Sequence, residues 1–149
     1  MHSTSLERLK RWHSGAAAVE FGLFAPILLI MLVGTIELGI SMYQAMQVSN
    51  AVEAGALWVM KTGDVAGIAA AAQNASAVTG ITATTTQFCG CPNATGITAT
   101  VCGSGATCGA GTPAGQYVRI NAQLPHQSML VNTLGLPATF TAKSIVRLD

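Results

Sequence analysis

The sequence predicts an α+β protein. A long N-terminal membrane helix continues outside the membrane, and a second short helix and a small antiparallel sheet of about 3–4 strands follow it. Three observations predict this architecture. Residues 16–46 contain only two charged residues, residues 65–78 are rich in alanine, and the chain from Thr79 onward is rich in threonine and alternating apolar residues. We therefore divide the chain into a leader (1–15), a transmembrane helix (16–46) and an exported α+β domain (47–149).

The first element is a membrane-spanning helix. The run from Phe21 to Ile36 contains no charged residue, and with its flanks it provides the roughly 20 residues that a helix needs to cross a bilayer. The leader before it is basic and contains Arg8, Lys10 and Arg11. The positive-inside rule then places the N-terminus in the cytoplasm and the domain outside it. A cleaved signal peptide is the alternative, but the apolar run is long for one and no A-x-A-like site follows it.

Two acidic residues, Glu20 and Glu37, lie within this apolar helix. Carboxylates are costly in such surroundings and tend to be functional there. For Glu37 two interpretations stay open: it reaches the outer lipid headgroups, or it hydrogen-bonds a neighbouring helix.

Glu20 belongs to a motif. The segment SGAAAVEF, residues 14–21, follows a short charged leader and precedes the apolar helix. It resembles the type IV prepilin processing site, where a membrane aspartyl peptidase cuts after the glycine. The resemblance implies a cut between Gly15 and Ala16, so that residues 1–15 are removed. It also implies that Glu20 and Phe21 are assembly residues, with Glu20 pairing with the N-terminal amine of a neighbouring subunit in a low-dielectric fibre core.

A longer stretch extends the resemblance. Residues 15–39, GAAAVEFGLFAPILLIMLVGTIELG, resemble the opening of the TadE-like (TadE/TadF) proteins, pseudopilins of the tight-adherence (Tad) pilus. The small-residue run at 50–56 and the closing stretches YVRINAQLP and LGLPATFTAKSIVRLD are similar to that family too. The resemblance implies a pilin-like, single-pass protein of the bacterial inner membrane with a periplasmic domain.

The same resemblance implies a function and partners. The function would be that of a minor pilin or pseudopilin in adhesion or secretion. The partners would be the prepilin peptidase, other pilin or pseudopilin subunits, the Tad assembly platform and the lipid bilayer. The alternative is an unprocessed, membrane-anchored assembly or binding protein.

Beyond the membrane, the first helix is expected to continue. Val48, Val52, Gly55 and Val59 fall on one helical face, and Gly63 is a natural stop. Asp64 can cap a second helix over residues 65–78.

Alternation then predicts strands. Residues 98–101, 117–124 and 140–148 alternate, and the apolar residues of the last two segments lie on one side of each. One-sided alternation indicates an antiparallel sheet with one solvated face, the apolar face packing on both helices.

Four cysteines, Cys89, Cys91, Cys102 and Cys108, lie in the exported domain, where two disulfides are expected. Cys89 and Cys91 are two residues apart, so in a strand they point to the same side, and a bond between them would be strained. The pairing is either 89–102 with 91–108, or 89–108 with 91–102. The alternative, a four-thiolate zinc site, has unusual spacing here.

No catalytic constellation is evident, so we expect no enzyme, cofactor or metal. His126 is the only histidine outside the leader, and we expect it to be solvated in a loop. The formal net charge of +1 gives no indication of a nucleic-acid partner.

Overall fold

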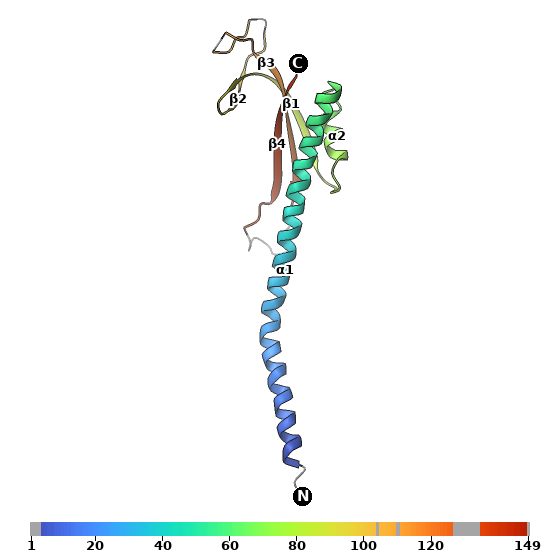
Figure 1. Ribbon diagram of the computed structural model, residues 1–149. Coiled ribbons are helices and arrows are strands. Elements are labelled where there is room, and N and C mark those ends of the chain that lie inside the picture. Colours follow the sequence, from blue (N-terminus) through green and yellow to red (C-terminus); the bar gives the residue numbers. More distant parts are fainter. Residues whose placement is uncertain (1–3, 104, 110, 127–134, 149) are drawn as a thin grey trace.

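The computed structural model describes residues 4–103, 105–109, 111–126 and 135–148. It consists of one very long helix with a small α+β domain along its C-terminal part (Figure 1). The elements follow in the order α1 (Thr4–Thr62), α2 (Ile68–Asn74), β1 (Thr82–Asn93), β2 (Gly96–Thr100), β3 (Gly115–Pro125) and β4 (Thr139–Leu148). The predicted α+β fold class is confirmed.

Helix α1 has two environments along its length. Large apolar side chains between Val19 and Leu32 are 53–72% exposed, whereas burial against the domain begins at Glu37. The predicted core face is confirmed, since Val48, Val52 and Val59 are each at most 3% exposed. The helix ends at Thr62, and Gly63 follows with φ 70°, a left-handed conformation that glycine adopts without strain.

Helix α2 is shorter than the predicted span of residues 65–78. The Asp64 carboxylate accepts hydrogen bonds from the amides of Ala66 and Gly67, which holds residues 64–67 as a turn before the helix starts. At the other end, the Ser76 hydroxyl accepts from the amide of Val78 and donates to its carbonyl. Local side-chain bonds of this kind compete with helical ones, so both ends of the alanine-rich stretch form turns.

The four strands form one antiparallel sheet in the order β2-β1-β3-β4. The predicted strands at 98–101, 117–124 and 140–148 correspond to β2, β3 and β4, with shifts of a few residues at their ends. Val118, Ile120 and Ala122 of β3 are almost fully buried, as their alternation predicts. Strand β1, which carries the Thr-rich segment, was expected only as a general β signal.

One face of the sheet packs on α1 and α2 and encloses the core (Figure 1). The close approach of α1 to the other elements depends on Gly55. A Cβ atom there would lie 3.1 Å from Ile68 Cγ2, 3.4 Å from Ala72 Cβ and 3.5 Å from Ile120 Cγ2. A small residue at this position therefore lets α1 pack closely against both α2 and β3.

Candidate functional site: a membrane helix and its junction with the domain

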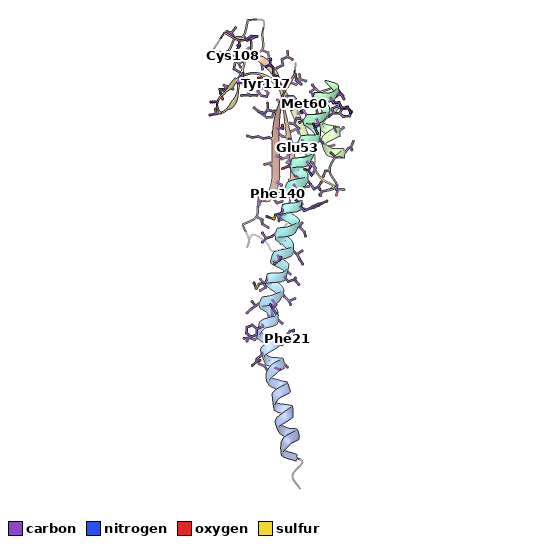
Figure 2. The ribbon with its side chains drawn as sticks, viewed as in Figure 1. Phe21, Glu53, Met60, Cys108, Tyr117 and Phe140 are labelled. Atoms are coloured by element: carbon purple, nitrogen blue, oxygen red, sulfur yellow. A yellow bond between two sulfur atoms is a disulfide. The ribbon has the colours of Figure 1, made fainter. Side chains whose placement is uncertain are left out.

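The residues of the expected processing and assembly site all lie in the N-terminal half of α1, far from the domain. Gly15 and Ala16 lie inside the helix, and Glu20 and Phe21 follow one turn later. Glu20 is exposed and Phe21 is 70% exposed, and Figure 2 shows Phe21 well below every strand. Among the residues whose side chains the structure describes, none pairs with Glu20.

The helix that could cross a membrane runs from Ala17 to Thr62. Only part of it is available to lipid, because the domain contacts α1 from Glu37 onward. The segment 17–36 has 20 residues and, at about 1.5 Å per residue, a length of about 30 Å, which equals the hydrocarbon thickness of a typical bilayer. The exposed apolar side chains thus fit one bilayer crossing.

At the upper end of this segment lies a buried polar cluster, formed by Glu37, Ser41 and Gln44 of α1 with His126, which follows β3. The side chains of His126 and Glu37 are 3% and 2% exposed. Glu37 Oε1 lies 3.3 Å from His126 Nε2, and Gln44 Oε1 lies 2.6 Å from His126 Nδ1. When both ring nitrogens carry protons, His126 donates to both oxygens and forms an ion pair with the carboxylate.

Two further contacts complete the cluster. The Ser41 hydroxyl donates to the Glu37 carbonyl at 2.8 Å, and its oxygen lies 3.4 Å from His126 Nε2. The ring of Phe140, the second residue of β4, lies 5.2 Å from the imidazole between centroids. The cluster therefore joins α1 to the ends of β3 and β4 that are nearest the membrane segment.

The expectation that His126 is solvated is wrong. Glu37 lies beside His126 of its own domain, a contact that neither interpretation of Glu37 included. The spacing of Glu37, Ser41 and Gln44 continues the core face that begins at Val48, and this periodicity was the available signal.

A serine, a histidine and a carboxylate meet here, but not as a hydrolytic triad. In a triad the acid holds one ring nitrogen while the serine faces the other. In this cluster Ser41 and Glu37 both face Nε2, and the Ser41 hydroxyl donates to a helix carbonyl. The geometry serves a structural contact between α1 and the domain.

The four cysteines lie at the opposite end of the domain. Cys89 is bonded to Cys102 and Cys91 to Cys108, with Cα–Cα distances of 5.2 and 5.5 Å. Disulfides were predicted, and the structure has one of the two pairings that remained open. A zinc site would need the thiolates free, so the structure contradicts that alternative. Figure 2 shows Cys108 in the lobe farthest from the N-terminus, and the two bonds link Cys102 and Cys108 to β1.

Comparison with known proteins addresses the helix. Residues 15–57 match the family model described as TadE-like protein, a span that covers the membrane segment, the Glu37 cluster positions on α1 and most of its core face. No curated protein and no solved structure matches the chain. Residues 15–57, which form most of α1, are therefore similar to TadE-like proteins.

Proposed function

We propose that this protein is a minor pilin or pseudopilin of a Tad pilus, cut between Gly15 and Ala16 by a prepilin peptidase and assembled through α1. The TadE-like family is a structural family associated with the Tad pilus, and it suggests other pilus components as partners. One observation carries the finer proposal: the family match begins at Gly15, where the motif places the cut, and then follows α1.

Packing within the subunit does not require a glycine at position 15. It lies in a regular helix, and a Cβ atom added there would meet nothing within 4 Å. Glycine costs roughly 1 kcal/mol in a helix relative to alanine, so its presence needs another reason. Entry of an extended, unhindered backbone into a protease is such a reason.

The proposed assembly contact is supported by the exposed position of Glu20 on α1. After the cut, the new amine of Ala16 and the Glu20 carboxylate are one helical turn apart on each subunit. Between subunits they attract strongly in apolar surroundings, and either charge alone is costly there. This contact would set the register between neighbouring helices.

For the membrane-inserted subunit, we propose that lipid covers residues 17–36, with the leader in the cytoplasm, the domain in the periplasm and the Glu37 cluster at the outer boundary. The supporting observations are the exposed apolar side chains of that segment and the start of domain contacts at Glu37. The basic leader supports this orientation.

The test is the N-terminal sequence of the protein purified from its native membrane, with two glycine variants as a matched pair. We expect the unaltered chain to begin at Ala16 and Gly15→Leu to retain Met1. Gly22→Leu is the control, because a Cβ atom at Gly22 also meets nothing within 4 Å, and it should be cut normally. An unaltered chain that begins at Met1 in cells containing the peptidase would favour the alternative, an anchored protein that keeps its leader.

A second test concerns Glu20. Glu20→Gln removes the charge and keeps the shape, and it should lower the amount of subunit in sheared pili at least about tenfold, as loss of a buried ionic contact predicts. The amount in the membrane should not change. Glu53→Gln makes the same chemical change at an exposed site of α1 beside the domain and should have no such effect. Normal pilus content in the Glu20 variant would refute the assembly role.

A further inference from the structure

The face of the sheet that points away from α1 is polar and basic. Its residues follow from the strand register, because the core residues of β1, β3 and β4 alternate with those of this outer face. The register places threonines of β1 beside amide side chains of β3, and these beside Thr141 and Lys143 of β4. The three complete cross-strand rows nearest the membrane are Thr82–Gln123–Thr141, Thr84–Asn121–Lys143 and Thr86–Arg119–Ile145.

Charge is distributed unevenly over this domain. Strands β1 to β4 contain Arg119, Lys143 and Arg147 and no acidic residue, and all three cations belong to the outer face. Glu53 and Asp64 lie on α1 and just after it, at the other side of the sheet. Asp149 lies outside the described residues. Arg119 and Lys143 are diagonal neighbours, a spacing of roughly 7–8 Å in an antiparallel pair, so an extended polyanion that crosses the strands can contact both.

An open groove of about 440 Å³ lies on this face beside Lys143. Its lining consists of Asn121, Ala122, Gln123, Thr141, Ala142 and Lys143. The outward side chains offer two amides, one hydroxyl and one ammonium group, whereas the side chains of Ala122 and Ala142 face the core. Such a lining provides donors and acceptors for hydroxyl groups and a cation for a carboxylate.

We propose that this outer face binds an acidic polysaccharide, with Lys143 and Arg119 contacting its carboxylates and the amide and threonine side chains contacting its hydroxyls. Charge complementarity and the hydroxyl-rich surface favour this occupant. A single-stranded nucleic acid fits less well, because stacking on aromatic side chains is a main contribution to such binding. The outer-face aromatics are Phe88, which already carries the Arg119 guanidinium 4.8 Å from its centroid, and Tyr117, which is 4% exposed.

The position of the face suits this role. In a fibre built around α1 helices, the side of the sheet that points away from α1 faces outward; this step alone rests on the proposed function. The binding chemistry itself depends only on the folded domain, so it can be tested on the chain in lipid nanodiscs whether or not the leader is cut.

The experiment measures binding of polygalacturonate to the full chain in nanodiscs, with dextran as the neutral probe and single-stranded DNA as the competing polyanion. We expect polygalacturonate to bind, more weakly as salt rises, and dextran not to bind. Lys143→Gln should raise Kd about tenfold, the loss of one charge-assisted hydrogen bond, and Arg119→Gln should act in the same direction. Lys61→Gln is the matched control, because it removes the same charge at the end of α1, away from the sheet.

Three results would overturn the proposal. They are an absence of polygalacturonate binding, an equal loss of affinity in Lys61→Gln, and tighter binding of DNA through the same two residues. Hydrogen exchange of the β3–β4 ladder checks that each variant is folded. Among the described residues, the Lys143 side chain makes no hydrogen bond, ion pair or ring contact, so Lys143→Gln remains informative even if loss of the Arg119–Phe88 contact loosens the sheet.

Discussion

Replacing His126 by alanine is expected to destabilise the junction between α1 and the domain. The change removes the ring that faces the Glu37 carboxylate at 3.3 Å and leaves that carboxylate at a site where its side chain is 2% exposed. Removing one partner of a buried ion pair costs about 3–5 kcal/mol. The loss of the Phe140 contact adds to this cost.

The assay is native-state hydrogen exchange of the β3 and β4 amides, with the full chain in nanodiscs. It reports the free energy of opening of the sheet while α1 remains in lipid. His126→Ala should lower this free energy by about 3–5 kcal/mol. Ser41→Ala should cost no more than about 1 kcal/mol, because the Ser41 hydroxyl donates to its own helix and lies 3.4 Å from the ring.

A double-mutant cycle separates the ionic contribution from packing. Glu37→Gln keeps the shape of the side chain and removes its charge. The free-energy cost of His126→Ala should therefore be about 2 kcal/mol smaller in the Glu37→Gln background than in the unaltered protein. Equal costs in the two backgrounds would refute the reasoning, because the histidine would then act only through its packing on Phe140.

Two other predictions concern the core and the distal lobe. Gly55→Val should destabilise the domain by about 1–3 kcal/mol, because even a Cβ atom there lies 3.1 Å from Ile68. Thermal unfolding in nanodiscs measures this change. The control is Gly39→Ala, which should not destabilise the domain because a Cβ atom at Gly39 meets nothing within 4 Å. A Gly55→Val domain as stable as the unaltered one would mean that α2 can move away at no cost. Joint replacement of Cys91 and Cys108 by serine opens a link between residues 17 apart and should cost about 3 kcal/mol in the chain-entropy account, seen as faster exchange in β2 with β3–β4 still protected. Mass spectrometry of the unaltered protein should detect four oxidised cysteines, and free thiols would contradict the disulfides.

Sequence periodicity predicted those parts of the fold whose pattern is local and apolar. The face formed by Val48, Val52 and Val59, the end of α1 before Gly63, and the alternation in β3 each need only a few neighbouring residues to be recognised. Strand β1 was harder, because its inward positions include Thr85 and Gln87, so the contrast between its two faces is faint.

The polar junction was missed for a different reason. His126 is 89 residues from Glu37 in the chain, and nothing near either residue indicates that β3 ends beside the membrane end of the core face. That meeting depends on the antiparallel direction of β3 along α1, which only the folded topology provides. The continuous spacing of Glu37, Ser41 and Gln44 with Val48 does show in the sequence that these polar residues share the buried side of α1.

The uninterrupted course of α1 has a mechanical consequence. The middle of the segment 17–36 and Thr62 are about 35 residues apart, or about 53 Å of rigid rod. Transmembrane helices tilt by about 20° on average, and a tilt of this size would displace Thr62 sideways by about 18 Å. Since β3 and β4 are fastened to the rod at His126, the domain follows this swing as one body. For the membrane-inserted subunit that we propose, any change in the tilt of α1, including one caused by hydrophobic mismatch, would change how far from the anchor point the distal lobe reaches.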